Sequence, residues 1–482
     1  MSQPKPTDAA KLQNEKRVGW FALGAVPDTA GPIVQTQMAN MIFNIELGLS
    51  PVLLGVAHTV MRLWDAFADP FVGSWSDRAK TRWGRRRPFV FMGSVGCALT
   101  FPLIWFCPAG LSEMAIFAFY LATSLLFLTT HSIYSMPWRA WGAEFSDDYH
   151  GRTRVWGRAQ AVMIVVYFIA TWLYALVSSR LFASPVIGMR TVAVATGIVI
   201  LVCGILPCWQ LRERVRAPSS PHPDERRGVI TSIGRAFQLR EMRLLTACSL
   251  FLTIGLQSVG QLALYLHIFY LFHGDKAAGS ILIGWSGTVA QTASFLSVPL
   301  GVWLSRRLGK RRALEVCILV TMTGIICKWW LYDPRWPYLV LVAAAMMAPV
   351  QVGLSTIMYS MLADVCDLDE LRSGRRQEGL YTAVYSWVSK AALALTGVLA
   401  GVALSLTGFD AALGAAQHES TLLLMLFTLC LLPVVALAVV LVLVRLYSLD
   451  EKAVAEVQRQ LAERRAVAAA AEPAADMAAT ER

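Results

Sequence analysis

Two aspartates lie close together inside an apolar stretch of the chain, WDAFADPFVGSW at residues 64–75. Asp65 and Asp69 are four residues apart, so on a helix both side chains share one face, with Cβ atoms roughly 5–6 Å apart. Two ionised carboxylates at that distance repel each other unless a cation or a proton lies between them. The pair therefore predicts a site for a coupling ion. Arg62 offers an alternative, because its guanidinium group can neutralise one carboxylate in a structural ion pair.

Three further charged residues lie in apolar segments. A charge at the centre of a bilayer costs about 2.5–3.5 kcal/mol on insertion scales, so it needs a partner or a function. Asp28 in an early segment and Lys390 in WVSKAALAL near the end of the chain can hold a hydroxyl-rich substrate by charge-assisted hydrogen bonds. Alternatively, Lys390 extends to the membrane surface or pairs with an acid. Arg139, in SMPWRAWGAE, is either a third substrate-binding residue or part of a gate at the end of its helix.

Composition indicates what kind of protein positions these charges. Of 482 residues, 56% are hydrophobic and 16% charged, and the mean hydropathy is +0.52. These values are typical of a protein that crosses the membrane many times. The net charge of +11 comes from Lys and Arg in short loops between apolar segments, a distribution that sets topology. We therefore expect the lipid bilayer and a small-molecule substrate as partners, no nucleic acid, and a monomer.

Twelve stretches are long and apolar enough to cross a membrane as helices, which takes roughly 20 residues. Approximately, they cover residues 18–43, 51–77, 88–108, 114–143, 156–180, 190–211, 244–272, 278–305, 313–332, 337–363, 380–407 and 420–447. The first is interrupted by Pro27, Asp28, Gly31 and Pro32, which is tolerated where backbone lines a cavity. The fold class expected is an all-α membrane protein with twelve transmembrane helices in two halves.

Loop charges predict the orientation. Basic clusters follow spans two, eight and ten, which places those loops and both termini in the cytoplasm of a cell inner (plasma) membrane. The polar residues 1–17 do not resemble a cleavable signal peptide, so the first span is expected to direct its own insertion. Nine cysteines without a CxxC pair favour packing roles over disulfides or a zinc site. No cofactor is expected apart from the coupling ion.

The charged, proline-rich segment LRERVRAPSSPHPDERRG at residues 211–228 divides the spans six and six. The sequence predicts an N-terminal half (1–211), a cytoplasmic linker (212–242), a C-terminal half (243–448) and a cytoplasmic tail (449–482). GRRRPFVFMGSVG at 84–96 has a weak echo in GKRRALEVCILVT at 309–321. Both follow the second span of their half, which indicates a parallel six-span repeat. The alanine-rich tail is expected to be a short helix followed by disorder.

Three motifs in three loops carry a resemblance that covers essentially the whole chain. They are WDAFADPFVGSWSDRAKTRWGRRRP (64–88), MPWRAWGAEFSDDYHGRTR (136–154) and LADVCDLDELRSGRRQEG (362–379). In order and spacing they resemble the glycoside-pentoside-hexuronide:cation symporters of the major facilitator superfamily. The resemblance implies the fold of that superfamily and a secondary active transporter. Such a protein moves a sugar, glycoside or uronide together with H⁺ or Na⁺ by alternating access.

The resemblance also assigns residues. Asp65 and Asp69 match the family's cation-site aspartates, and Ser132 matches a cation-site threonine. Asp28 matches a sugar-binding aspartate, Lys390 a functional lysine, and Ser386 a hydroxyl residue one turn before it. The predicted cation site is Asp65, Asp69 and Ser132, with Na⁺ as the one possible metal at Asp65 and Asp69. The predicted substrate-binding residues are Asp28, Arg62, Ser135, Arg139, Ser386 and Lys390.

Four positions depart from the family pattern. Ser135 replaces a second sugar-binding aspartate and Arg139 replaces a stacking tryptophan, so an anionic sugar or another acidic amphiphile becomes more plausible than a neutral galactoside. Trp138 still offers an aromatic surface, but it faces elsewhere on an ideal helix. Ala68 replaces an asparagine, which removes one oxygen ligand and weakens the case for Na⁺. Ala159 replaces an arginine, and Arg158 lies one position earlier.

A third group of charges lies at the expected cytoplasmic face and, by resemblance, latches it closed in the outward-open state. Single surface pairs contribute about 0–1 kcal/mol, but a network that breaks as a unit can bias a two-state equilibrium. Gly84 would supply a tight turn. The predicted gating residues are Asp77, Arg78, Gly84, Arg85, Glu144, Arg152, Asp364, Asp367, Arg376 and Glu378.

Two readings from other classes remain as alternatives. A cation-coupled carrier of lysophospholipid, or of another anionic amphiphile, would use Arg139 and Lys390 to hold a phosphate and tryptophan-rich walls to accept a tail. A membrane-embedded enzyme would use His58 or His131, but neither belongs to an HxxxH pair or accompanies a nucleophile motif. Lone histidines in a membrane more often pack or form hydrogen bonds, so no enzymatic activity is expected.

Overall fold

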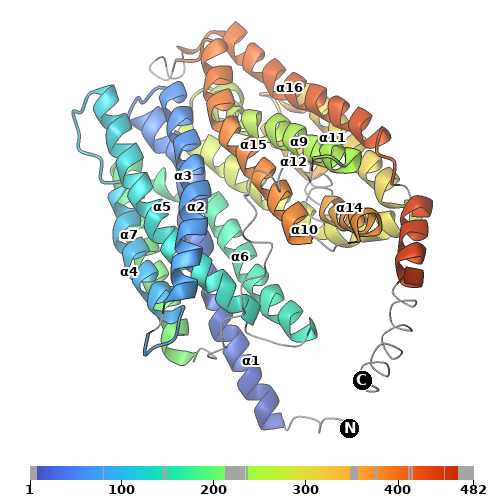
Figure 1. The fold of residues 1–482 in the computed structure, drawn as a ribbon. Helices are drawn as coiled ribbons and strands as arrows, with labels where there is room; N and C mark the ends of the chain where they lie inside the picture. Colours follow the sequence, from blue (N-terminus) through green and yellow to red (C-terminus); the bar gives the residue numbers. More distant parts are fainter. Residues whose placement is uncertain are drawn as a thin grey trace, which may run out of the picture.

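The computed structural model describes residues 8–79, 81–144, 149–211, 234, 237–347, 357–374, 378–410, 413, 416–449 and 451–464. Every regular element in this part of the chain is a helix. The first described helix, α1 (Asp8–Leu23), and the last, residues 451–464, lie on the same side of the molecule, which we call the terminal end (Figure 1).

The N-terminal half contains the first six spans. Its helices are α1 (Asp8–Leu23), α2 (Ala25–Ala39), the π-helix η1 (Asn40–Glu46), α3 (Pro51–Arg78), α4 (Arg87–Leu103), α5 (Glu113–Glu144), α6 (Tyr149–Val177) and α7 (Pro185–Gln210). The first three follow one another as a single broken span, and each of the other five is one span.

The C-terminal half repeats this plan. Its helices are α9 (Arg240–Tyr265), the π-helix η3 (Leu266–Leu271), α10 (Lys276–Leu308), α11 (Lys310–Leu331), the 3₁₀ turn η4 (Pro337–Leu339), α12 (Val340–Met346), α14 (Met358–Ser373), α15 (Glu378–Leu406) and α16 (Glu419–Arg445). Residues 451–464 form a further helix after α16, where the sequence predicts a short one.

The described helices agree with the predicted fold class. Eight of them are long and apolar enough to cross a membrane on their own, and shorter or more polar helices occupy the other predicted spans. The prediction for the third span is wrong at its end, because α4 stops at Leu103 rather than at 108. Pro108 disfavours the helical conformation for the residue before it. The tenth predicted span is described as α12 and α14, and residues 348–356 between them lie outside the described part.

The first span breaks earlier than the prolines suggested. Its break is at Gly24, between α1 and α2. Pro27 has no N–H to donate to the carbonyl of Leu23, so the helical ladder loses a bond at this point. Gly24 is required here, because a Cβ at this position would overlap the indole of Trp138. The hydroxyl of Tyr134 donates to the Gly24 carbonyl at 2.7 Å and satisfies it.

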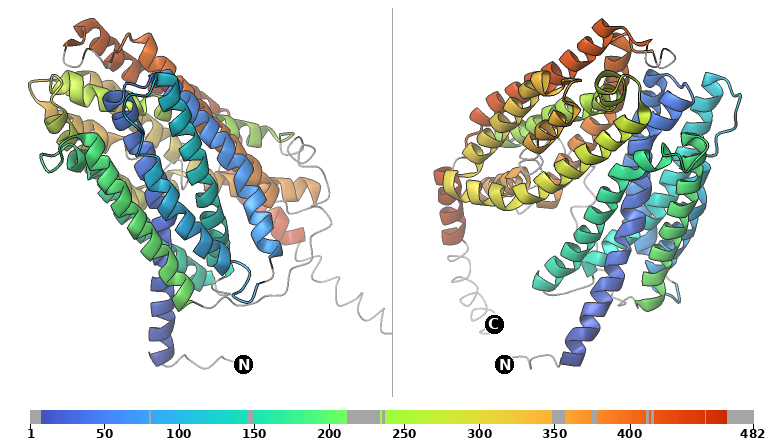
Figure 2. Two further views of the ribbon diagram at one scale, coloured as in Figure 1. Left: turned by 90° about the vertical axis from the view of Figure 1, so that its left-hand side faces the viewer. Right: turned by 180° about the vertical axis from the view of Figure 1, so that it is seen from behind.

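The two halves meet at the end away from the termini and diverge at the terminal end (Figures 1 and 2). Across the contact, α3 packs on α15 and α6 on α10. The Lys276 ammonium group lies 2.6 Å from Glu46 Oε1, and the Tyr265 hydroxyl donates to Asn44 Oδ1 at 2.7 Å. Glu46 and Asn44 belong to η1 in one half, and the other two residues belong to the second half.

Corresponding glycines precede the third span of each half. Gly84 has φ = 105° and Gly309 has φ = 78°, values that glycine adopts without the steric penalty of a Cβ. Helix α4 begins three residues after Gly84, and α11 begins directly after Gly309. Gly84 therefore forms the predicted turn, and the two motifs occupy equivalent places. The domain boundaries stay predictions, because most of the linker lies outside the described residues.

Candidate functional site

Helix α3 holds the two aspartates on the side that faces the other helices. Phe67, Phe71 and Trp75 are exposed and form an apolar stripe along one side of α3. At 100° per residue, Asp65 and Asp69 project roughly opposite that stripe. Because α3 packs against both α5 and α15, the carboxylates lie between an N-terminal and a C-terminal helix.

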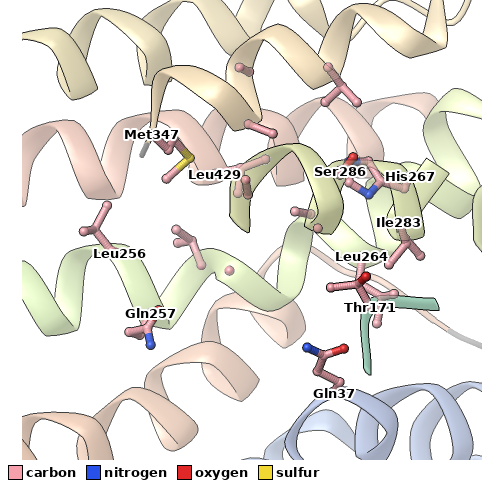
Figure 3. A pocket seen from close by; sticks show the side chains of 18 of the residues that line it. Gln37, Thr171, Leu256, Gln257, Leu264, His267, Ile283, Ser286, Met347 and Leu429 are labelled. Atoms are coloured by element: carbon pink, nitrogen blue, oxygen red, sulfur yellow. The ribbon is translucent and has the colours of Figure 1, made fainter. Parts of the chain in front are cut away.

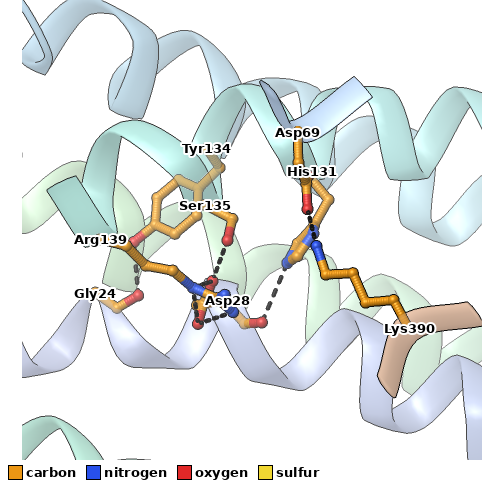
Figure 4. Close-up of polar contacts among 8 residues, drawn as sticks. All are labelled: Gly24, Asp28, Asp69, His131, Tyr134, Ser135, Arg139 and Lys390. Carbon is orange, nitrogen blue, oxygen red and sulfur yellow. Dashed lines mark hydrogen bonds and ion pairs between the residues drawn. The ribbon is translucent and has the colours of Figure 1, made fainter. Parts of the chain in front are cut away.

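Asp69 contacts both of these helices, and Figure 4 shows its contact with Lys390 on α15. The Ser132 hydroxyl on α5 donates to Asp69 Oδ1 at 2.7 Å, and the Lys390 ammonium on α15 lies 3.4 Å from Asp69 Oδ2. The carboxylate is 18% exposed and the Lys390 side chain 49% exposed. The structure thus brings together three predicted site residues from three helices, and the Asp69–Lys390 ion pair links the two halves.

Asp65 has a weaker partner. Its Oδ2 lies 3.9 Å from a guanidinium nitrogen of Arg62, and 40% of the Arg62 side chain is exposed. Exposed pairs at such distances contribute about 0–1 kcal/mol. Arg62 therefore balances the charge of Asp65 without holding it firmly, and Asp65 remains available to a cation beside Asp69.

Asp28 is buried, with its side chain 2% exposed. The Arg139 guanidinium group reaches both carboxylate oxygens, with Nε at 3.3 Å from each and the second nitrogen at 3.1 Å from Oδ2. Ser135 donates to Oδ1 at 2.5 Å. The Arg139 side chain is itself 52% exposed, so the buried carboxylate has one charged donor that reaches water and one neutral donor. Figure 4 shows Asp28 enclosed by these two partners, so Ser135 supports Asp28 and the pair carries no net charge.

A proline in α2 explains a further contact of Asp28. Pro32 has no N–H for the carbonyl of Asp28, four residues earlier. His131 Nε2 lies 3.1 Å from that carbonyl, and because a carbonyl only accepts, Nε2 is the protonated nitrogen. His131 lies between the Asp28–Arg139 and Asp69–Lys390 pairs (Figure 4). From the sequence, His131 is expected to pack or to form hydrogen bonds. Pro32 in the partner helix was the signal for its place in the site.

Trp138 points away from this cluster, as the helical geometry predicts. It is fully buried, and its ring stacks on Phe21 with centroids 5.0 Å apart. It therefore fixes α1 against α5 rather than forming a substrate surface in this conformation.

A cavity of about 600 Å³ lies between the halves, lined mainly by the C-terminal half and by α2, η1 and α6. Its size suits a small organic ligand. Figure 3 shows Gln37 and Thr171 facing a wall formed by α9, η3, α10 and α16, with Gln257, His267, Ser286 and Leu429 among its labelled residues. None of the predicted cation-binding or substrate-binding residues lines it. Lys328 lines the cavity, and it is not among the residues predicted from the sequence.

The remaining predicted substrate residue, Ser386, lies one turn before Lys390 on α15. It is partly buried and forms no hydrogen bond with another described residue. Its place on the helix agrees with the resemblance, and its role stays a prediction.

The structure changes the picture of one predicted gating residue. Asp364 accepts two hydrogen bonds of 2.7 Å from Lys310, a partner in its own half rather than across the terminal face. Whether Asp364 also takes part in a latch across the terminal face stays a prediction, as do the gating roles of Asp367 and Arg85. The structure does not describe the side chains of Asp77, Arg78, Glu144, Arg152 and Glu378, and Arg376 lies outside the described residues.

Among the described residues, no group of three His, Cys, Asp or Glu side chains is arranged to hold a metal ion. The charged cluster offers one carboxylate shared between a hydroxyl and a lysine, and a second carboxylate beside it. Such a site suits a monovalent cation or a proton that competes with the lysine.

Comparisons with known proteins identify the family of this chain. A family model described as "MFS/sugar transport protein" matches residues 20–451. The putative glycoside/cation symporter YagG of Escherichia coli is 25% identical, over 98% of this chain and 99% of its own. The glucuronide carrier protein homolog of E. coli is 23% identical, over 93% and 95%. The sodium-dependent lysophosphatidylcholine symporter 1-A of Danio rerio is 22% identical, over 90% and 85%.

The fold also matches solved structures. A bacterial homolog of the human lysosomal transporter Spinster, in an inward-facing and unoccupied conformation, superimposes with a TM-score of 0.66 at 16% sequence identity. The match covers 92% of this chain and 98% of the other.

Proposed function

The chain belongs to the MFS/sugar transport protein family, and from that premise we propose that it is a cation-coupled symporter of a sugar, glycoside or uronide. Relatives named as a glycoside/cation symporter and a glucuronide carrier confirm the resemblance that the loop motifs indicated. The protein is a multi-pass membrane protein with the fold of the major facilitator superfamily. Its family and its structural neighbours are membrane transporters rather than enzymes.

The Asp69–Lys390 ion pair is the observation that carries the proposal. In this conformation the Lys390 ammonium group lies where a coupling cation would contact Asp69. A bound Na⁺, or a proton on Asp69, weakens the attraction for Lys390, and so it breaks a contact between the two halves. A ligand that changes an inter-half contact has different affinities for the two conformations. That difference is the requirement for coupling ion binding to rocking.

Both coupling ions remain open in this proposal. Asp69, Asp65 and Ser132 provide oxygen ligands for Na⁺, while Ala68 supplies no side-chain oxygen. A proton needs only one carboxylate.

We place both termini in the cytoplasm of the inner (plasma) membrane, as the basic loops predict. With that orientation, the Lys276–Glu46 and Tyr265–Asn44 contacts lie at the outer face, and the conformation described here is open to the inside. The charged cluster and the cavity then face the compartment into which substrate is released.

Uptake by proteoliposomes tests the proposal with Asp65→Asn and Asp69→Asn. Each glycoside of a panel is supplied outside the vesicles under an imposed Na⁺ or H⁺ gradient. We expect gradient-driven accumulation to fall at least about tenfold in each variant, because an amide carries no charge and takes up no proton, so it attracts a cation much more weakly than a carboxylate does. Exchange of substrate without a gradient should be affected much less. Asp410→Asn, at an exposed position after the end of α15, is the matched control. Full accumulation by both variants would disprove the cation site.

A lysophospholipid is the second candidate substrate, and one observation favours it. A relative of similar length is named as a sodium-dependent lysophosphatidylcholine symporter. Uptake of labelled lysophosphatidylcholine, compared with that of glycosides under the same gradient, decides between the two substrates. Uptake of lysophosphatidylcholine without uptake of glycosides would change the proposed substrate from a sugar to a lysophospholipid. It would not affect the proposed cation site.

A further inference from the structure

One end of the cavity contains three polar groups for which the described part of the chain provides no hydrogen-bond partner. Nδ1 of His267 and the hydroxyl of Ser286 are buried without a partner there, the ammonium group of Lys328 forms no hydrogen bond or ion pair with a described residue, and all three residues line the cavity. We propose that this end is a subsite for an anionic group of the transported molecule, either a carboxylate or a phosphate. The inference rests on the proposed function and adds to it the charge of the substrate and the place where that charge binds.

Lys328 provides the positive charge. It lies in the last turn of α11 and is 7% exposed. Among the described residues, no carboxylate pairs with it and no acceptor bonds to its ammonium group. A lysine near a helix end often extends to the membrane surface, but this burial is inconsistent with that role. A buried cation without a counter-charge is costly, and an anionic ligand in the adjoining cavity would remove that cost.

His267 and Tyr332 lie next to this lysine. Tyr332 is one helical turn after Lys328, and its backbone N–H donates to the Lys328 carbonyl. Its ring stacks on His267 with centroids 5.7 Å apart, and its hydroxyl lies 3.3 Å from Nε2. A tyrosine hydroxyl that donates to Nε2 leaves the proton on Nδ1. His267 is then a donor with no acceptor among the described residues.

Ser286 completes the set from α10. Its hydroxyl is buried without a partner among the described residues, and its side chain lies beside His267 (Figure 3). An ammonium group, an imidazole N–H and a hydroxyl can all donate to the oxygens of one anion. A neutral hydroxyl group in the same place would satisfy hydrogen bonds but leave the charge of Lys328 uncompensated. One cation with two further donors beside it therefore favours an anion.

The rest of the cavity suits the remainder of such a molecule. Gln37, Gln257 and Gln291 line it and provide amides for hydroxyl groups. Leu252, Leu256 and Leu264 line it as well and offer apolar surface. A sugar acid or an amphiphile with an acidic group would therefore place its charge at Lys328 and its polar or apolar body along the cavity.

Binding to purified full-length protein in nanodiscs tests the subsite without any ion gradient. The probes are p-nitrophenyl β-D-glucuronide, the matching β-D-glucoside, which differs by its lack of a carboxylate, and lysophosphatidylcholine. Calorimetry measures each Kd for the wild type, Lys328→Gln, Lys328→Arg and Ser286→Ala. Lys452→Gln, an exposed lysine in the helix after α16, is the matched control.

We expect the wild type to bind one anionic probe more tightly than the glucoside. Lys328→Gln should weaken that probe by at least about tenfold, equivalent to about 1.4 kcal/mol. Lys328→Arg should retain most of the affinity, and Ser286→Ala should show an intermediate loss. If Lys328→Gln loses affinity for the glucuronide, the natural anion is a carboxylate. If it loses affinity for lysophosphatidylcholine, the natural anion is a phosphate. Unchanged glucoside affinity in Lys328→Gln shows that the variant is folded.

Equal affinity of every probe for the wild type and Lys328→Gln would overturn the inference, as would an equal loss for all three probes. Neither result bears on the cation site, since Asp65→Asn and Asp69→Asn are measured by gradient-driven uptake. Conversely, uptake that does not depend on either the Na⁺ or the H⁺ gradient would refute symport. The difference in Kd between the wild type and Lys328→Gln would not be affected by that result.

Discussion

At the scale of single residues, Asp28 and Arg139 depend on each other. Arg139→Gln leaves the buried Asp28 carboxylate without its counter-charge, and we expect the free energy of unfolding to fall by about 1–3 kcal/mol. The figure stays below that of a fully buried pair, because the Arg139 side chain is 52% exposed. Thermal unfolding in detergent measures the loss, and Asp28→Asn combined with Arg139→Gln should recover part of it. Strictly additive effects of the two substitutions would show that the pair is not coupled.

The sequence could indicate which residues carry unusual charge but not how they pair. Asp28, Asp69 and Lys390 are visible because a charge in an apolar segment is costly whatever surrounds it. That Arg139 neutralises Asp28, and that Lys390 reaches Asp69, depends on how α2, α5 and α15 pack. Lys328 could not be predicted for a related reason. It lies near the end of a span, where a lysine can extend to the membrane surface and needs no partner.

At the scale of elements, Pro32 leaves the Asp28 carbonyl without a backbone donor, and His131 bonds to it instead. In the wild type, His131→Ala should destabilise the protein by about 0.5–1.5 kcal/mol, since the Asp28 carbonyl loses its donor. In a Pro32→Ala background, the new backbone N–H can serve that carbonyl, so the same substitution should cost less. A double-mutant cycle on the unfolding free energy measures the coupling. His58→Ala, whose ring bonds to Tyr120, is the control and should cost the same in both backgrounds. An identical cost of His131→Ala in both would refute the link.

Helix positions were predictable to within a few residues at most ends because hydropathy and length are local properties. The beginning of α3 and of η4 coincide with the predicted beginnings of spans two and ten. The breaks were harder to place. The first span breaks at Gly24, because Pro27 acts on the carbonyl four residues before it and Trp138 fills the space beside Gly24. The second of these causes lies more than a hundred residues away along the chain.

At the scale of the whole molecule, the two six-helix halves could be predicted from the central polar segment, the even number of spans and the repeated basic turn. The conformation could not. Which end of the molecule is closed depends on small free-energy differences between two packings of the same helices. Glu46 and Lys276 show this, since neither appears in the predicted gate and both close the end away from the termini.

Lys276→Gln should therefore shift the protein toward the conformation in which the terminal end closes. The pair is partly exposed, so its contribution is about 0–1 kcal/mol, equivalent to a population change of up to about fivefold. Spin labels at Gly157→Cys on α6 and Arg307→Cys on α10, in a background without the native cysteines, report the distance between the halves at that end. Shorter distances should become more populated in Lys276→Gln and return toward the wild-type distribution when Lys276→Glu is combined with Glu46→Lys. A distribution that is the same in all three proteins would show that this ion pair does not set the balance between the two conformations.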